Sequence, residues 1–218
     1  MGQNTNRGLF IVFEGIDGSG KSSLSKALYS HLKENGVPCM LTCEPTLDNV
    51  LGLLIREYLK DPSIDESTMS LLFAADRVEH VKKIKRALKE GTTVICDRYI
   101  YSNFVYQGEF PSRDIHQVLK DKLLVPDLTF FIDADPDVCI GRIAARGKSL
   151  DKYETLDNLE RMRKDYRYLL SHNALVYAYP SYANSIIDID GNTSIEEGAE
   201  KVISAYSKAS KAFSKEAV

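Results

Sequence analysis

The residues from Phe13 to Ser22 have the composition and spacing of a phosphate-binding loop. Gly15 and the run Gly20-Lys21-Ser22 fit the pattern G-x-x-x-x-G-K-[ST]. Glycines in such a loop let several backbone N–H groups point at one phosphate, and the lysine adds a full positive charge. We predict that this stretch binds the phosphates of a nucleoside triphosphate. The candidate ligands are Gly15, Asp17, Gly18, Ser19, Gly20, Lys21, Ser22 and Ser23.

The segments on either side of this loop are those that phosphate binding requires. The apolar run 9–13 predicts a buried strand, and 23–32 predicts a helix because its apolar residues recur at helical spacing. The N-terminus of that helix adds unsatisfied donors and partial positive charge. The alternative is a glycine-rich turn before an ordinary helix, which would not require strand, loop and helix in this order.

A second candidate site follows another apolar strand, at Asp97 and Arg98. After a phosphate loop, an aspartate in this position holds Mg²⁺ directly or through water, together with the serine of the loop, here Ser22. Arg98 can bind a phosphate through two parallel hydrogen bonds. The alternative is a helix-capping aspartate beside a surface arginine.

Two helical segments carry side chains suited to a base and a sugar. Phe73 and Arg77 are four residues apart and share a helix face, where they offer an aromatic platform and a planar donor. From spacing alone, a core phenylalanine and a solvated arginine explain this pair better. The second segment is either a recognition surface or a plain polar helix face. It carries Ser102, Asn103, Tyr106 and Gln107.

Residues 146–153 are charged, contain a glycine and lack apolar periodicity, so we predict a short mobile lid there. An arginine arriving from a lid stabilises the charge that spreads over a phosphoryl group in flight. Arg142 and Arg146 are one helical turn apart and Lys148 follows, so each of the three is a candidate. The alternative is a solvated basic loop.

Composition limits the classes of function. The chain has 218 residues and a formal net charge of −3, which gives no general attraction to nucleic acid. The four cysteines have no zinc-site spacing, and most lie in apolar runs, as buried free thiols do in a reducing compartment. We see no signal-peptide pattern and no run long enough to span a bilayer. We expect a cytoplasmic protein without nucleic-acid or membrane partners.

Strands alternate with helices along the chain, which predicts one α/β domain over residues 1–218. We expect a three-layer sandwich, a five-stranded parallel sheet with helices on both faces. Ligands of such a sheet bind where its strands end, so the candidate sites should meet at one edge. The predicted strands are 9–13, 39–43, 92–96, 128–132 and 185–189. The predicted helices are 23–32, 49–59, 66–89, 100–107, 114–124, 138–145, 156–175 and 194–209.

These motifs together resemble the thymidylate kinase family of P-loop nucleoside monophosphate kinases. The resemblance rests on the phosphate loop, Glu44-Pro45, the run 73–77 and the run 97–107, which follow that family's order and spacing over nearly the whole chain. It implies transfer of the γ-phosphate of ATP to thymidine 5′-monophosphate (dTMP) with Mg²⁺, giving dTDP and ADP for dTTP biosynthesis. It also implies a homodimer packed through helices.

The resemblance implies roles in binding the nucleoside of dTMP. Phe73 would stack on thymine, and Arg77 would donate to its O4 atom. Asn103, with Ser102, would read the N3 side of the ring. Tyr106 would lie under the sugar and disfavour a 2′-hydroxyl group, which selects deoxyribose.

The resemblance also implies four catalytic residues. Lys21 would bind the donor phosphates, Arg98 the acceptor phosphate and Arg146 the transferring group, while Asp17 would bind the 3′-hydroxyl or its shell. Arg142 would assist with ATP. The implied dTMP ligands are Asp17, Glu44, Phe73, Arg77, Arg98, Ser102, Asn103, Tyr106 and Gln107. The implied metal ligands are Ser22 and Asp97.

Two positions depart from the family pattern. Some members have an arginine directly after the aspartate of the phosphate loop, where this chain has Gly18, so the lid would take on that role. Many members also have an arginine beside the Glu-Pro step, where this chain has Cys43 and Thr46. Arg56, on the next predicted helix, is a possible replacement.

Other functions predict different behaviour. A related kinase for another monophosphate or for a nucleoside would prefer that acceptor over dTMP. A nucleotide-dependent switch would hydrolyse ATP without an acceptor, but we see no glutamine placed to orient water. The negative net charge of the chain makes a nucleic-acid-binding module less favoured still.

Overall fold

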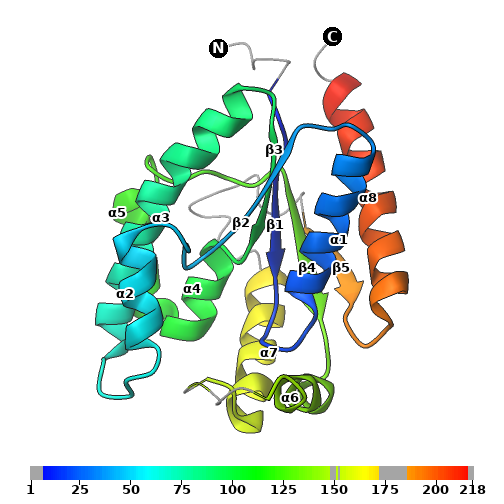
Figure 1. Ribbon diagram of the computed structural model, residues 1–218. Helices are drawn as coiled ribbons and strands as arrows, with labels where there is room; N and C mark the ends of the chain where they lie inside the picture. The colour runs from blue at the N-terminus through cyan, green and yellow to red at the C-terminus, as the bar shows by residue number, and fades with distance from the viewer. Residues whose placement is uncertain (1–6, 148–150, 152, 172–185, 216–218) are drawn as a thin grey trace.

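The computed structural model describes residues 7–147, 151, 153–171 and 186–215, which form a five-stranded sheet with helices on both faces (Figure 1). All four strand pairings are parallel, in the order β2-β3-β1-β4-β5. The predicted fold class is therefore confirmed. The strands are β1 (Phe10–Glu14), β2 (Cys39–Cys43), β3 (Thr93–Asp97), β4 (Leu128–Asp133) and β5 (Ile186–Asp190).

The central strand β1 is apolar throughout because helices cover both of its faces. Phe10 and Val12 pack into one core, while Ile11 and Phe13 pack into the other. The first core includes side chains from α3, α4 and α7, and the second includes side chains from α1 and α8. The helices are α1 (Lys21–Glu34), α2 (Val50–Tyr58), α3 (Glu66–Lys89), α4 (Ile100–Gln107), α5 (Glu109–Leu119), α6 (Pro136–Ala144), α7 (Leu156–Ser171) and α8 (Ile195–Lys215).

Strand register brings the candidate sites to one edge of the sheet. Phe13 and Cys43 both lie opposite Asp97, so β1, β2 and β3 end at the same level. The segments that follow these strands are the phosphate loop, Glu44-Pro45 with a cis peptide bond, and Arg98. The parallel topology therefore places the candidate sites at one edge of the sheet, as expected.

Some element boundaries differ from those that apolar spacing predicts. α5 begins at Glu109 instead of residue 114, directly after Gly108, whose φ of +89° separates it from α4. It ends at Leu119 because 120–124 turn back, and the Leu124 N–H donates to the Tyr99 hydroxyl at 3.1 Å. α6 begins two residues early at Pro136, since proline suits the first turn of a helix. The ends predicted at 172–175 and 185, and Lys148, lie outside the described residues.

Candidate active site

A cavity of about 570 Å³ opens at the edge of the sheet where β1, β2 and β3 end. Among the described residues, every predicted substrate, ATP, metal and catalytic residue lines this cavity except Gly15, Ser19 and Arg142. Residues as distant in sequence as Asp17, Phe73 and Arg146 therefore share one space. The roles assigned to them remain predictions.

The phosphate loop has the backbone that its glycines were predicted to allow. Gly18 has a φ of +80°, and a Cβ atom there would lie 2.5 Å from the carbonyl oxygen of Cys139. Gly20, with a φ of +105°, leads directly into α1 at Lys21. The first residues of α1 line the cavity, so the start of this helix, which stabilises anions, lies beside it.

Lys21 lies inside this loop, and its Nζ donates to the Ile16 carbonyl at 2.7 Å. Burial and the nearby charge of Arg98 lower the pKa of Lys21 to about 8. A bound polyphosphate would favour the charged form again. Lys21 therefore fits a ligand that carries negative charge.

Arg142 lies against the outside of the phosphate loop. Its Nη1 donates to the Gly191 carbonyl at 2.8 Å and, at longer distances, to those of Gly18 and Ser19. Arg146, one turn further along, is exposed and lines the cavity. Of these two arginines, Arg146 is the better placed to reach a phosphate.

Arg98 joins the phosphate loop to α4. Its backbone has a φ of +71°, which is uncommon for a residue other than glycine and occurs often at functional sites. Its guanidinium forms an ion pair with Asp17 and donates to the Tyr106 hydroxyl at 2.8 Å and to Ser102 Oγ at 3.1 Å. Burial alone would raise the pKa of Asp17, but the charges of Arg98 and Lys21 outweigh it and lower this pKa to about 2.

Glu14, which sequence analysis did not single out, supports this cluster from inside the core. Its fully buried carboxylate accepts from Ser102 Oγ at 2.6 Å, the Tyr99 N–H at 2.9 Å and the Tyr166 hydroxyl at 3.0 Å. Burial raises its pKa. Glu14 therefore fixes the start of α4, and with it the position of Ser102.

Ser22 and Asp97 are in contact, as the predicted metal site requires. The Ser22 hydroxyl donates to Asp97 Oδ2. The other oxygen, Oδ1, is buried and has no hydrogen-bond partner among the described residues. A hydroxyl and a carboxylate oxygen are hard oxygen ligands of the kind Mg²⁺ prefers beside nucleotide phosphates, so these residues fit that ion.

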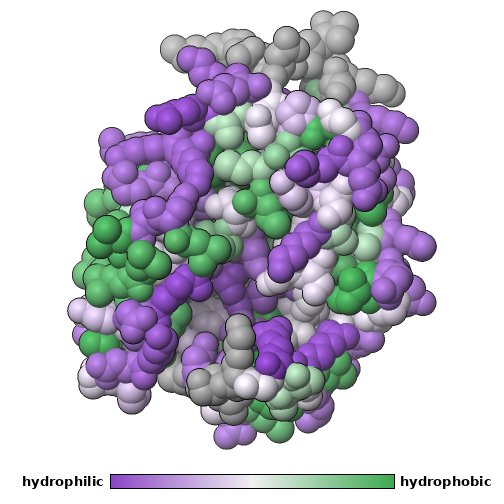
Figure 2. Space-filling model, in the orientation of Figure 1, coloured by the Kyte–Doolittle hydropathy of each residue, from purple (hydrophilic) through white to green (hydrophobic). Residues whose placement is uncertain are grey.

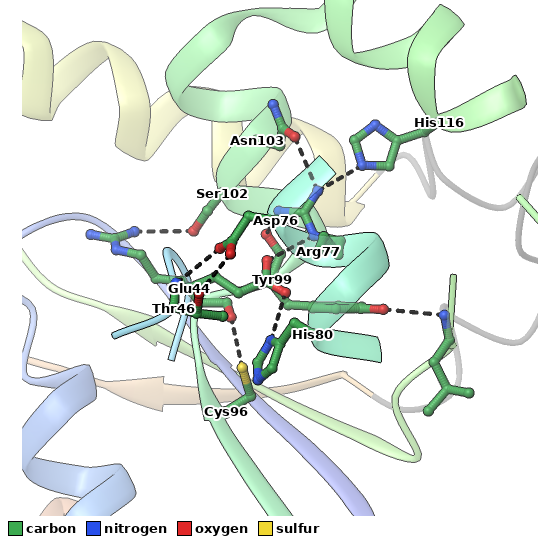
Figure 3. A network of polar contacts seen from close by, with 12 residues as sticks. Glu44, Thr46, Asp76, Arg77, His80, Cys96, Tyr99, Ser102, Asn103 and His116 are labelled. Carbon is green, nitrogen blue, oxygen red and sulfur yellow. Dashed lines mark hydrogen bonds and ion pairs between the residues drawn. The ribbon is translucent and has the colours of Figure 1, made fainter. Parts of the chain in front are cut away.

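Arg77 is the centre of a buried polar network (Figure 3). Nε donates to Glu44 at 2.8 Å, Nη2 to the Tyr99 carbonyl at 3.0 Å, and Nη1 to Asn103 Oδ1 at 3.0 Å and His116 Nε2 at 2.9 Å. Since a guanidinium only donates, His116 must accept through Nε2, and its Nδ1–H donates to the Ser112 carbonyl at 2.6 Å. Arg77 is 1 % exposed, so the expectation of a solvated arginine is wrong.

The loop after β2 is held by a second buried carboxylate, Asp76. It accepts from the Thr46 N–H at 2.8 Å, the Thr46 hydroxyl at 2.6 Å and the Asn49 side chain at 2.8 Å. Glu44, at the start of the loop, is also hydrogen-bonded to His80, with 3.1 Å between Oε1 and Nδ1. Figure 3 shows Glu44, Asp76 and His80 gathered around Arg77.

Arg56, on α2, lies beside the Glu44-Pro45 step. It donates to the Pro45 carbonyl and lines the cavity. Its Nε is buried and has no partner among the described residues. Arg56 therefore lies beside the step next to which the sequence lacks an arginine, and its role as a replacement stays a prediction.

Two of the residues that sequence analysis missed, Asp76 and His80, share a signal that it could have used. Met69, Phe73, Asp76 and His80 recur at helical spacing, so two polar residues fall on the apolar face of α3. A charged group at a core position is rarely buried without partners. His116 and Glu14 carry no such local signal, because their partners lie far away in the sequence.

Comparison with known proteins decides the family. The family model for thymidylate kinase matches residues 13–197. The chain is 37% identical over 213 residues to the thymidylate kinase of Chlamydia caviae, which covers 92% of this chain and 98% of that protein. It is 36% identical over 167 residues to the thymidylate kinase of Leptospira borgpetersenii, covering 74% of this chain and 81% of that protein.

The chain belongs to the thymidylate kinase family. It is an ATP-dependent nucleoside monophosphate kinase. This confirms the resemblance seen in the motifs. Across the part of the chain that the structure describes, no helix has the length and apolarity to cross a bilayer.

Proposed function

We propose that this enzyme transfers the γ-phosphate of ATP to dTMP, with the two nucleotides bound end to end in the cavity. The observation that carries the proposal is the placement of Arg98 between the phosphate loop and the Arg77 network. An acceptor whose base reaches Arg77 would present its phosphate to Arg98, beside Lys21. Two anionic groups would then meet among fixed positive charges.

The acceptor phosphate would be held by Arg98 and Arg56. Both line the cavity, and Arg56 brings a buried Nε that needs an acceptor. The phosphate of dTMP is already an anion, so the reaction needs no strong general base. Arg98 and Arg56 would instead align this nucleophile and offset its charge as it approaches ATP.

The base would be recognised at Phe73 and Arg77. Four of the five N–H groups of Arg77 donate to protein acceptors, and the remaining one, on Nη2, has no partner among the described residues. That N–H would donate to thymine O4, and Phe73, which also lines the cavity, would stack on the ring. Tyr106, held by Arg98 and Asp17, would pack against the sugar.

The donor phosphates would be held by the phosphate loop and Lys21, and Arg146 would approach the transferring group. Arg142 and Lys148 remain candidates for ATP contacts. Mg²⁺ at Ser22 and Asp97 would neutralise charge on the donor phosphates. Asp17 would keep Arg98 and Tyr106 in place as well as meet the sugar hydroxyl.

Two copies of the chain would associate through α2 and α3. Val50 and Leu53 lie three residues apart on α2, so they share a face, and they are 80% and 54% exposed. Leu47 and Leu71 are also more than half exposed. Figure 2 shows hydrophobic residues (green) gathered on the side where Figure 1 places α2 and α3. A second copy of this face is the self-complementary partner of a two-fold dimer.

The site of action would be the cytoplasm. All four cysteines are free thiols, which persist in a reducing compartment. The proposed ligands of the cavity, ATP and a nucleoside monophosphate, would have to be present in the same compartment.

A coupled assay of ADP release with each nucleoside monophosphate in turn tests the proposed function. We expect the highest kcat/KM with dTMP and little ADP release without an acceptor. Preference for a purine monophosphate would overturn the assignment of thymine to Phe73 and Arg77. Steady hydrolysis without any acceptor would indicate a nucleotide-dependent switch instead.

A further inference from the structure

One continuous chain of hydrogen bonds runs along the wall of the cavity from Arg77 and ends at Glu66. Arg77 Nη1 donates to Asn103 Oδ1 at 3.0 Å, and Asn103 Nδ2 donates to Gln107 Oε1 at 3.2 Å. Gln107 Nε2 donates to the Tyr153 hydroxyl at 3.3 Å, which donates to Glu66 Oε2 at 2.7 Å. Figure 3 shows its first link, from Arg77 to Asn103.

The two charged ends determine the direction of every bond between them. A guanidinium only donates, so Asn103 must turn its oxygen to Arg77 and its amino group to Gln107. A carboxylate only accepts, so the Tyr153 hydroxyl gives its hydrogen to Glu66 and must accept from Gln107. Both ends therefore require the same orientation of the Gln107 amide.

Packing holds Tyr153 in the position that this chain of hydrogen bonds requires. Its ring meets the ring of Tyr106 edge to face, with centroids 5.2 Å apart, and the residue is 5% exposed. Glu66 is the first residue of α3, where the helix dipole favours a carboxylate. The chain of hydrogen bonds borders the space proposed for the base, because Tyr153, Gln107 and Asn103 also line the cavity.

We propose that Glu66 and Tyr153 are positioning residues that fix the Gln107 amide and so select pyrimidines with a hydrogen on N3. The inference rests on the proposed binding of dTMP in this cavity. Asn103, to which the family resemblance gives the N3 side, already bonds Arg77 and Gln107 through its oxygen and its amino group. A carbonyl oxygen accepts two hydrogen bonds, so Gln107 Oε1 can take a second one from the N3–H of thymine or uracil. Cytosine has a bare lone pair at N3, which would face that oxygen without a hydrogen between them. A pocket of fixed polarity rejects such a ligand because polar groups are left unpaired.

The test uses the variants Tyr153→Phe and Glu66→Gln. The first keeps the ring and removes the hydroxyl. The second keeps the size of the side chain, but an amide can donate or accept and no longer imposes a direction. We expect the kcat/KM preference for dTMP over dCMP to fall about three- to tenfold in Tyr153→Phe, the worth of one hydrogen bond, and less in Glu66→Gln.

The comparison with dUMP separates this role from a merely structural one. Uracil shares the N3–H of thymine, so the dTMP to dUMP preference should stay unchanged in both variants. Tyr168→Phe and Glu79→Gln, at exposed positions, are the matched controls. An unchanged dTMP to dCMP preference, or equal losses with all three substrates, would overturn the inference. The wild-type rate with dTMP in the same assay tests the proposed function separately.

Discussion

At the scale of single residues, the charge state of Lys21 should control ATP affinity. Its pKa of about 8, lowered by burial and Arg98, means that the free enzyme loses this charge as the pH rises through 8. Because ATP binds the charged form, we expect the Kd for ATP to be about tenfold weaker near pH 9 than near pH 7. Calorimetric titration at both pH values measures this.

The control for Lys21 is Lys21→Arg, whose guanidinium stays charged over this range. Its Kd, even if weaker, should change little between the two pH values. If the wild type bound ATP equally well at both pH values, Lys21 would already be charged at pH 9 in the nucleotide-free enzyme.

Arg98→Ala should remove turnover while leaving ATP binding nearly intact. Arg98 lines the cavity and would face the acceptor in the proposed binding mode, and the loss of one such charged donor costs about 10²–10³ in kcat. Steady-state kinetics with dTMP and a separate ATP titration measure both quantities. Loss of ATP affinity with normal turnover at saturation would place Arg98 on the donor side instead.

The buried His116 should make stability depend on pH. Burial and the charge of Arg77 lower its pKa to about 3, whereas an unfolded histidine titrates near 6.5. Between these values the unfolded chain binds more protons, so stability is full above about pH 6.5 and falls as the pH drops toward 3. His116 alone should lower the free energy of unfolding by about 2 kcal/mol between pH 7.5 and pH 5.

Urea unfolding of wild type and His116→Gln at the two pH values isolates this contribution. Glutamine keeps an acceptor for Arg77 but does not titrate. We expect a smaller loss of stability in the variant on going to pH 5. Parallel losses in both proteins would mean that other groups account for the acid sensitivity.

At the scale of elements, the loop between β2 and α2 depends on a carboxylate of α3. Asp76→Asn replaces one acceptor oxygen with an amino group that faces the donors of Thr46 or Asn49. We expect a loss of about 2–3 kcal/mol in the free energy of unfolding, and a higher KM for dTMP because Arg56 and Glu44 shift. Asp48→Asn is the control, since its ion pair with Lys83 is exposed. Indistinguishable effects of the two variants would refute this anchoring role.

The same elements show why the sequence predicted one part of the site and not another. The phosphate loop and Asp97-Arg98 were predictable because short spacings and the strand-end rule of parallel sheets place them. Glu14 meets Tyr166 across 152 positions, and no local pattern encodes such a contact. The sequence also could not predict the environment of Arg77, because His116, one of its partners, lies on α5. Apolar spacing placed the start of that helix five residues too late.

At the scale of the whole molecule, the exposed apolar side chains of α2 should hold two copies together. Exposed apolar groups of this size gain free energy when they leave water, in proportion to the area they bury. We expect wild type to elute at twice its 24.5 kDa mass in size-exclusion chromatography with light scattering. The double variant Val50→Glu and Leu53→Glu should elute as a monomer, because each interface would then carry four added charges.

Val138→Glu, on α6, is the matched control and should remain dimeric. Leu47 belongs both to the exposed apolar set and to the lining of the cavity, so the proposed dimer contact and the proposed acceptor site would be adjacent. The monomeric variant should therefore bind dTMP more weakly while its affinity for ATP, at the other end of the cavity, stays the same. A wild-type monomer at micromolar concentration would exclude this face as a stable interface, and a dimer that survives both substitutions would place the contact elsewhere.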